Sequence, residues 1–216
     1  MGGFNLKAVI FDFDGTIVDT ETLWVDVYQE IIKEKYNVSI PISIFEACVG
    51  TVDDALYDYL VTFVDATITR QQLSPIAEKN VDKKLCELMP RQGVIELLTS
   101  LRDSGYRLAI ASGSQRKWID LFLKQHHLNT YFEEICCADD VENVKPHPDI
   151  YLATLQALNL QPEQCFAIED SINGSLAALS AKILCYIVPN EVTKHSTFPQ
   201  GTIRVNYFSD IPHRAH

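Results

Sequence analysis

The sequence predicts an α/β fold with a doubly wound parallel sheet of the Rossmann-like type and an inserted all-helical cap domain. Short apolar runs alternate with segments in which apolar residues recur every three or four positions. This alternation is typical of a parallel sheet covered by helices on both faces. The alternation stops between about residues 19 and 89, where every pattern is helical. We therefore expect an α/β core made of residues 1–18 and 90–216, and a cap domain made of residues 19–89.

Five apolar runs are each long enough for one buried parallel strand. They cover residues 6–11, 107–111, 135–138, 165–168 and 183–188. Residues 202–207 form a weaker pattern, which we interpret as an edge strand in a poorly periodic tail. Helical patterns occupy residues 94–101, 118–125 and 150–157, and Gly105 stands where the first of these helices would end.

The inserted block contains three helical patterns, at residues 23–31, 55–63 and 76–88. It follows directly on the first expected strand and ends before the second, so we expect it to pack as a separate unit. Such a unit is well placed to close over a ligand bound at the carboxyl ends of the strands, excluding water and selecting the substrate.

The composition argues against several classes of partner. Lys and Arg total 18 against 29 Asp and Glu, a net charge of −11, and no basic cluster interrupts the acidic background. Neither a nucleic acid nor a membrane surface is therefore an expected partner, because both attract clustered positive charge. The N-terminus has no signal-peptide pattern, and the 6 Cys include no CxxC pair. We expect a cytoplasmic, reduced protein that is a monomer.

The first apolar run ends in the string VIFDFDGTIVDT, residues 9–20. Asp12 and Asp14 would emerge at the carboxyl end of a strand, where open α/β sheets bind their ligands. Gly15 permits a sharp turn close to a ligand. An Asp after a strand often only caps a turn, but the combination of the apolar run, DxDGT and Asp19 is much rarer and indicates a functional site.

This string resembles the first motif of the haloacid-dehalogenase-like phosphatases, and the chain supplies the three further motifs of that superfamily in order. Ser112 closes RLAIAS and matches the phosphate-binding Ser or Thr after the second core strand. Lys145, in VKPHPDIY, matches the basic residue of the third motif. Glu169 and Asp170 close CFAIEDS and match the acidic pair of the fourth, and SINGS at 171–175 continues as in that family. The resemblance spans the chain except for its tail.

Each of these matches also has a structural explanation when taken alone. Ser112 could belong to an ordinary helix N-cap loop, Lys145 could be a solvated lysine in a turn, and the pair at 169–170 could cap the following helix. Three of the four motifs nevertheless close an apolar run at the same expected edge of the sheet. The chain departs from the family at Lys182, where a Gly often ends the last core helix, and at Gln92, where a Pro is usual; both concern local loop geometry.

The charges of the motif residues indicate a divalent cation. Asp12, Asp14, Glu169 and Asp170 would converge with only Lys145 opposing them, and two carboxylates about 4 Å apart repel by roughly 4 kcal/mol at an effective dielectric of 20. Mg²⁺ suits oxygen ligands together with a phosphate. The resemblance implies that the ion is held by the Asp12 carboxylate, the Asp14 backbone carbonyl and the Asp170 carboxylate. Glu169 is either a further ligand or a support for the ligands.

The resemblance also implies a function: Mg²⁺-dependent hydrolysis of a small phosphate monoester, by default a sugar phosphate or a related metabolite. Asp12 would attack the phosphorus atom and form an aspartyl phosphate. Asp14 would protonate the leaving alkoxide and then deprotonate the hydrolytic water. Ser112, the Gly113 amide and Lys145 would bind the equatorial oxygens of the phosphate.

Two alternatives differ in what happens to the phosphoryl group. A phospho-acceptor signalling domain shares the sheet, the acceptor Asp and the Lys before Pro, but its acidic pair comes first in the chain and it has no helical insert. A sugar-phosphate mutase of the β-phosphoglucomutase type shares the helical cap. That branch carries a His where this chain has Trp24, and an Arg on the cap loop that corresponds to residues 50–54, which hold no basic residue.

The charge of the cap domain favours the hydrolase over the mutase. Residues 19–89 hold 6 basic and 13 acidic residues, a net charge of −7 that would repel a second phosphate. Trp24 could either contact the substrate or pack in the core of the cap domain. A distant lysine such as Lys79 could still reach the site.

Overall fold

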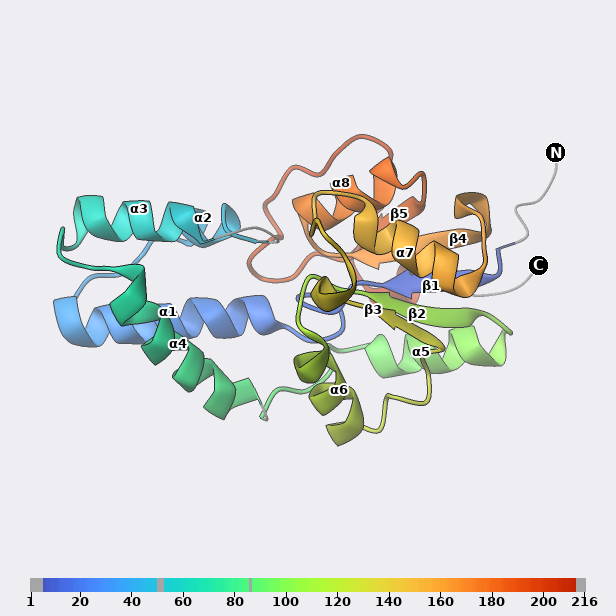
Figure 1. Cartoon of the computed structure of the whole chain (residues 1–216), viewed down its shortest axis with the longest axis horizontal. Helices are drawn as coiled ribbons and strands as arrows, with labels where there is room; N and C mark the ends of the chain where they lie inside the picture. The colour runs from blue at the N-terminus through green and yellow to red at the C-terminus, as the bar shows by residue number, and fades with distance from the viewer. Residues whose placement is uncertain (1–5, 50–52, 86, 213–216) are drawn as a thin grey trace.

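The computed structural model describes residues 6–49, 53–85 and 87–212. Its core is a six-stranded sheet with the strand order β3-β2-β1-β4-β5-β6, and every neighbouring pair is parallel (Figure 1). The strands are β1 (Ala8–Phe11), β2 (Arg107–Ala111), β3 (Glu134–Cys136), β4 (Cys165–Glu169), β5 (Leu184–Ile187) and β6 (Thr202–Arg204). All six predicted strands are present within a few residues of their predicted bounds, and the predicted fold class is confirmed.

Four helices cover the two faces of the sheet, which makes it doubly wound. They are α5 (Val94–Asp103), α6 (Arg116–Gln125), α7 (Asp149–Leu158) and α8 (Ile172–Ser180). Alternate residues of β1 point to opposite faces: Val9 and Phe11 pack in a cluster with side chains of α5 and α6, and Ala8 and Ile10 pack in a second cluster with side chains of α7 and α8. Each fully buried Ile or Phe in these clusters stabilises the fold by about 1.5–3 kcal/mol.

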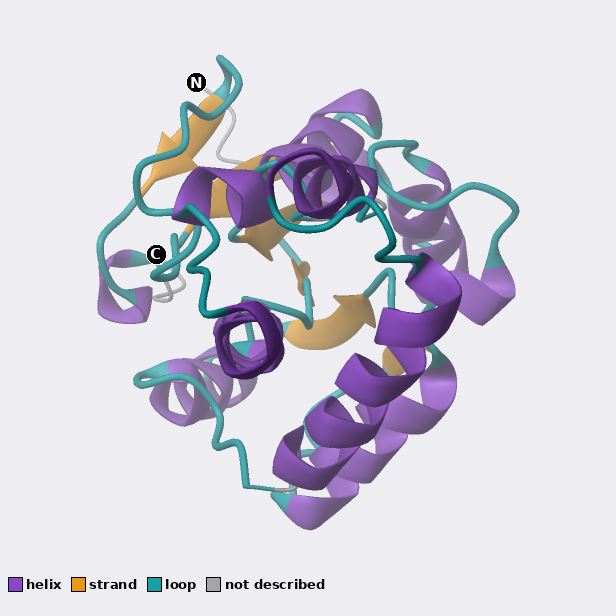
Figure 2. Ribbon diagram, turned by 90° about the vertical axis from the view of Figure 1, so that its left-hand side faces the viewer, coloured by secondary structure: helices purple, strands orange, loops and turns teal. Residues whose placement is uncertain are grey.

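The described residues of the inserted block form four further helices, which make up the end of the molecule that faces the viewer in Figure 2. They are α1 (Thr20–Tyr36), α2 (Ile42–Glu46), α3 (Asp54–Phe63) and α4 (Arg70–Leu85). Their apolar side chains form a third buried cluster, and among the described residues Val192 is the one member from outside the inserted block. Val18 and Pro90 pair in an isolated bridge where the two connections to the core meet. The division into residues 1–18 with 90–216 and 19–89 remains a prediction, which this separate cluster supports.

Helix α4 begins earlier than the sequence pattern predicts, at Arg70 instead of residue 76. Pro75 lies inside the helix, although proline removes a backbone donor and disfavours a helix interior. Leu73 and Ala77 are buried on either side of Pro75, so packing of this face retains the helix across the proline. Within the described ranges, no helix has the length and apolar composition needed to cross a membrane.

The two departures from the family pattern lie in turns that favour glycine. Lys182 follows α8 and adopts φ 63°, in the left-handed region, while its N–H donates to the Leu179 carbonyl at 2.9 Å. A residue other than glycine costs about 1–2 kcal/mol in this conformation. Gln92 precedes Gly93, whose φ of 90° lets the chain turn into α5.

Candidate active site

The register of the three central strands brings the motif residues together. Phe11 is paired with Ile110 of β2 and with Ile168 of β4, so the residues that follow these strands emerge at one edge of the sheet. The Asp12 N–H donates to the Ile168 carbonyl at 2.9 Å, which joins β1 to β4 at this edge. β1 lies between β2 and β4, both of which come later in the chain. Such a position, where the strand order reverses, is where open α/β sheets bind ligands.

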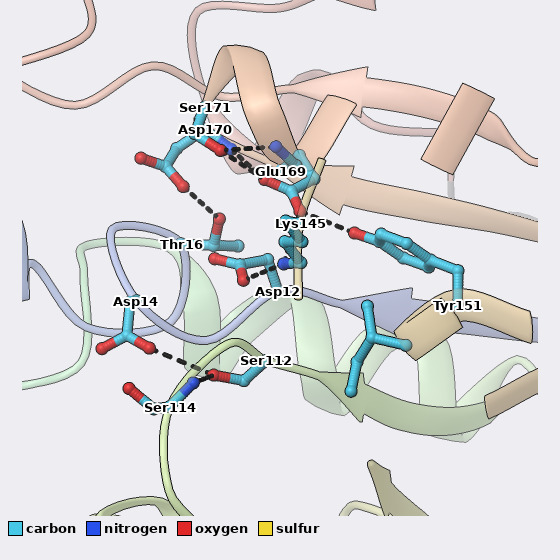
Figure 3. A network of polar contacts seen from close by, with 12 residues as sticks. Asp12, Asp14, Thr16, Ser112, Ser114, Lys145, Tyr151, Glu169, Asp170 and Ser171 are labelled. Atoms are coloured by element: carbon cyan, nitrogen blue, oxygen red, sulfur yellow. Dashed lines mark hydrogen bonds and ion pairs between the residues drawn. The ribbon is translucent and has the colours of Figure 1, made fainter. Parts of the chain in front are cut away.

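Lys145 reaches this edge and joins the first motif to the fourth. Its ammonium group donates to Asp12 and to Glu169 (Figure 3). The distances are 2.5 Å to Asp12 Oδ1 and 2.7 Å to Glu169 Oε1, and the Lys145 side chain is only 6% exposed. Burial lowers the pKa of Lys145, but the carboxylates of Asp12 and Glu169 outweigh that effect and raise it above its ordinary value. Lys145 is therefore a fixed positive charge beside Asp12.

Glu169 is held by donors on both of its carboxylate oxygens. Besides Lys145, Tyr151 donates from its hydroxyl to Oε1 at 2.7 Å, and Ser171 donates to Oε2 at 3.2 Å. A Cβ atom at Gly174 would lie 2.0 Å from Glu169 Oε2, so only glycine lets α8 approach the carboxylate so closely. Sequence reasoning missed Tyr151, because it lies within the amphipathic pattern of α7 and looks like a core aromatic residue.

Asp14 lies on the opposite side of the site and is bonded to Ser112. The Ser112 hydroxyl donates to Asp14 Oδ2 at 3.1 Å, and the Thr20 hydroxyl donates to Asp14 Oδ1 at 3.0 Å. The Ser114 N–H in turn donates to Ser112 Oγ at 2.9 Å. Figure 3 shows Asp14 and Ser112 pointing toward each other from the loops after β1 and β2. Thr20, the first residue of α1, thus forms a hydrogen bond to one oxygen of Asp14.

Asp170 is anchored by residues from two distant loops. Thr16 donates to Asp170 Oδ1 at 3.1 Å, and Asn190 donates to Oδ2 at 2.8 Å. Gly15 adopts φ 79°, and a Cβ atom there would lie 2.3 Å from Asp170 Oδ2. The sequence motif DxDGT includes Gly15 and Thr16, but sequence reasoning gave Thr16 no role and missed Asn190. Asn190 follows β5 in the segment that has little periodicity.

Arg91 joins the loops that surround this anchor and was also missed. Its guanidinium donates to the carbonyls of Gly15, of Val188 at 3.1 Å and of Pro189 at 2.7 Å. Arg91 therefore connects the second link between the inserted block and the core to the loops after β1 and β5. Three bonds to backbone carbonyls are typical of a structural role, which explains why no chemical motif reveals this residue.

A cavity of about 500 Å³ opens above Asp12 between the sheet edge and the inserted helices. Asp12, Asp14, Gly113 and Lys145 line it from the core, whereas Ser112, Glu169 and Asp170 are buried behind the lining. The structure thus brings all the predicted site residues to one place. The helical side is lined by α1 and its neighbours: Glu21, Trp24, Val25, Tyr28, Phe45, Cys48, Asp53, Leu56, Ser74 and Glu78. Trp24 both lines the cavity and packs against the helical core.

Comparison with known proteins identifies the family. The family model for the haloacid dehalogenase-like hydrolases matches residues 9–188, which include all four motifs and the inserted helices. The chain belongs to this hydrolase family. The predicted superfamily and the predicted enzyme class, a hydrolase, are confirmed.

Curated relatives and solved structures align with most of this chain. YhcW of Bacillus subtilis is 39% identical over 97% of this chain and 90% of its own length. The phosphorylated carbohydrates phosphatase of Thermotoga maritima is 29% identical over 82% of each protein. A hydrolase of this family from Deinococcus radiodurans, solved with bound phosphate and sodium, superposes with a TM-score of 0.81 at 26% identity, covering 96% of this chain and 94% of that one.

Negative charge accumulates at the site of this haloacid dehalogenase-like hydrolase. Burial, together with the nearby Glu169 and Asp14, raises the pKa of Asp12 to about 8, although Lys145 lowers it. Burial and the neighbouring Asp12 and Glu169 also raise the pKa of Asp170 well above its ordinary value. One ammonium group therefore does not balance the carboxylates that surround it, and a further positive charge would stabilise their ionised forms.

The oxygen atoms at the site fit a divalent cation. Asp12, Glu169 and Asp170 each offer a carboxylate oxygen within 4.8 Å of the others. Asp12 Oδ2 is buried and has no hydrogen-bond donor among the described residues. A buried carboxylate oxygen needs a partner, which can be a hydrogen-bond donor or a cation. Oxygen donors of this kind suit Mg²⁺. Glu169 is already neutralised by the Lys145 ammonium group, whereas among the described residues Asp170 accepts only from the neutral Thr16 and Asn190 and Asp12 keeps an oxygen without a donor. Asp12 and Asp170 are therefore the side chains better placed to hold the ion.

We expect Mg²⁺ to raise the melting temperature of the metal-free protein, and to raise it more at about pH 8 than at about pH 6. A carboxyl group with a raised folded-state pKa stabilises the fold while protonated. That stability is lost as the pH rises through the folded-state value, which for Asp12 is about 8. The cation replaces the lost proton, so its effect grows with pH.

Thermal unfolding with EDTA or with Mg²⁺ at the two pH values measures this effect. Asp26→Asn is a matched control, because Asp26 is exposed on α1 and should leave the gain unchanged. Asp170→Asn should reduce the gain. Equal melting temperatures with and without Mg²⁺ at both pH values would contradict the assignment of a cation site.

Proposed function

We propose that this chain is a Mg²⁺-dependent phosphatase that hydrolyses small phosphate monoesters through an aspartyl phosphate on Asp12. Asp12 supports this proposal most directly. It lines the floor of the cavity, lies 2.5 Å from the Lys145 ammonium group and has a second oxygen without a donor among the described residues. A carboxylate beside a fixed cation can meet an anionic phosphate that it would otherwise repel.

The surrounding residues transfer protons and bind the phosphate oxygens. A carboxylate oxygen of Asp12 forms a bond to phosphorus as the bond to the leaving oxygen breaks, and Asp14 gives that oxygen a proton. Asp14 then takes a proton from water, whose oxygen attacks the phosphorus, releases inorganic phosphate and restores the Asp12 carboxylate. Lys145, the Ser112 hydroxyl and the Gly113 amide hold the phosphate oxygens during both steps.

Asp12, Asp170 and the backbone carbonyl of Asp14 would hold the Mg²⁺ ion. When bound, the ion supplies positive charge that offsets the charge of the phosphate and of the carboxylates. Glu169 would not be a ligand, because Lys145 and Tyr151 already donate to it. Its role is to keep the Lys145 ammonium group directed at Asp12.

The substrate is proposed to be a phosphorylated sugar or a related metabolite. A cavity of about 500 Å³ suits a small molecule and not a polymer. The relative from Thermotoga maritima that is named as a phosphatase of phosphorylated carbohydrates supports the same class.

A hydrolase is favoured over a mutase by the charge of the cavity. Among the described residues that line it, Lys145 is the one cation, and the inserted helices contribute carboxylates instead. Arg70 of α4 is paired with Asp53 and Asp54, at 2.9 and 2.7 Å. Lys79 is exposed and does not line the cavity. Residues 50–52 of the cap loop lie outside the described residues.

A single incubation tests this proposal against both alternatives. The protein is mixed with β-glucose 1-phosphate, Mg²⁺ and a trace of glucose 1,6-bisphosphate, and inorganic phosphate and glucose 6-phosphate are both measured. We expect inorganic phosphate to accumulate over many turnovers, and EDTA to stop its release. Glucose 6-phosphate accumulating faster than phosphate would indicate a mutase, and a single stoichiometric phosphorylation would indicate a signalling domain.

A further inference from the structure

One face of α1 lines the cavity with side chains that change from polar to aromatic along the helix. Glu21, Trp24, Val25 and Tyr28 lie at positions i, i+3, i+4 and i+7, which share one face of a helix. Glu21 is in the first turn, next to Thr20, whose hydroxyl bonds to Asp14. The rings of Trp24 and Tyr28 are stacked farther along, with centroids 6.0 Å apart and an interplanar angle of 28°. This face is polar near the reacting centre and aromatic away from it.

The carboxyl group of Glu21 is unlike its acidic neighbours, because no group among the described residues bonds to it. Asp14 accepts from Ser112 and Thr20, and Asp19 accepts from Thr22. No hydrogen bond or ion pair joins the Glu21 side chain to any other residue in the part of the chain that the structure describes. Burial and the proximity of Asp14 raise the pKa of Glu21 to about 8. Glu21 is partly buried in the cavity lining, so a ligand that enters the cavity can bond to its carboxyl group without displacing a protein partner.

We propose that Glu21 is the specificity-determining residue that binds a hydroxyl group on the alcohol part of the substrate, with Trp24 covering the carbon skeleton. This inference rests on the proposed phosphatase function and deepens it by naming polyhydroxylated phosphate esters as the preferred class. A carboxyl group can accept a hydrogen bond from a hydroxyl when ionised and donate one when protonated. A second phosphate or a carboxylate on the substrate would instead approach the carboxyl groups of Glu21 and Asp14, which offer it no positive charge.

A hydroxyl group bound to Glu21 would also orient the substrate relative to Asp14. Thr20 ties the start of α1 to Asp14 Oδ1 at 3.0 Å, so a hydroxyl bound by the next residue is held at a set place relative to the general acid. The substrate would then present its ester oxygen to Asp14 in one orientation. Proper orientation of this kind raises the rate as well as the affinity.

The test compares two esters that differ in the alcohol part: a hexitol phosphate, which has several hydroxyl groups, and phenyl phosphate, which has none. The ratio of the two kcat/KM values is measured in Mg²⁺ for the wild type, Glu21→Gln and Glu21→Leu. We expect Glu21→Leu to lower the ratio of hexitol phosphate to phenyl phosphate by roughly tenfold to a hundredfold. Glu21→Gln should lower it less, because an amide keeps a hydrogen-bonding group. Asp26→Asn, on the exposed face of α1, is the control and should leave the ratio unchanged.

An equal loss with both esters, or an unchanged ratio, would overturn the role of Glu21. Calorimetric titration with hexitol phosphate separates this result from failure of the proposed function. In an Asp12→Asn background, which is not expected to turn over, the additional Glu21→Leu change should weaken binding of hexitol phosphate more than binding of phenyl phosphate. A wild type that releases no phosphate from either ester refutes the phosphatase proposal. In that case, a larger loss of binding for hexitol phosphate than for phenyl phosphate on Glu21→Leu would still support the role of Glu21. Equal losses of binding for the two esters would refute the role of Glu21 as well.

Discussion

Replacing Asp12 with Asn is expected to abolish turnover, lowering kcat by more than about 10⁴-fold, while the protein stays folded. An amide has the size of the carboxylate but cannot act as the nucleophile that forms the aspartyl phosphate. The fold should survive, because the substitution removes one of several crowded negative charges and leaves the packing of β1 unchanged. Burial already raises the pKa of Asp12 to about 8, so a neutral group is tolerated there.

Steady-state phosphate release and thermal unfolding are the two measurements for Asp12→Asn. Asp120→Asn serves as the control, since Asp120 is exposed on α6 and does not line the cavity. A homogeneous, folded Asp12→Asn sample with rates close to those of the wild type would refute the assignment of the nucleophile. An unfolded Asp12→Asn sample would show that the carboxylate is needed for the fold, and would contradict the second half of the prediction.

Replacing Asp14 with Ala is expected to slow turnover by roughly 10²–10⁴-fold, the usual cost of losing a general acid–base group. The loss should be larger for an alkyl phosphate, whose leaving oxygen needs a proton, than for p-nitrophenyl phosphate. Asp12 should still be phosphorylated by the activated ester, giving a burst of p-nitrophenol followed by slow hydrolysis. Rapid-mixing measurements of p-nitrophenol release and steady-state rates with both esters test these expectations.

The matched variant Asp14→Asn separates chemistry from structure. Ser112 and Thr20 donate to the two oxygens of Asp14, and Asn keeps one acceptor for them, whereas Ala keeps none. If Asp14 transfers protons, both variants should be slow with the alkyl ester. Recovery of the rate in Asp14→Asn would show that Asp14 only positions Ser112, and an unchanged rate in Asp14→Ala would remove Asp14 from the mechanism.

The motif residues at the sheet edge were predictable from the sequence because they directly follow strands. Asp12, Ser112 and Glu169–Asp170 each close an apolar run, and parallel strands in register bring their carboxyl ends to one edge. The order of the strands in the sheet could not be predicted in this way. These residues nevertheless converge in any parallel sheet in which the strands that precede them are neighbours. The alternation of strands and helices likewise determined the fold class.

The residues that hold the site together were decided only by the tertiary structure. Tyr151 supports Glu169 from a helix that looks apolar, Asn190 supports Asp170 from a segment without periodicity, and Arg91 bonds to backbone carbonyls far away in the chain. Each acts through a contact between segments distant in sequence, which no local spacing records.

The start of α4 and the setting of Glu21 depend on tertiary packing in the same way. Burial of Leu73 and Ala77 keeps the helix across Pro75, against the local preference of proline. Glu21 occupies an ordinary first-turn position of a helix, where a carboxylate is common. Only the packing of the inserted helices over the sheet edge encloses it beside Asp14. The sequence alone therefore determined which groups can react, and the three-dimensional packing decided which groups orient them, because orientation depends on distances between chain segments that only folding brings together.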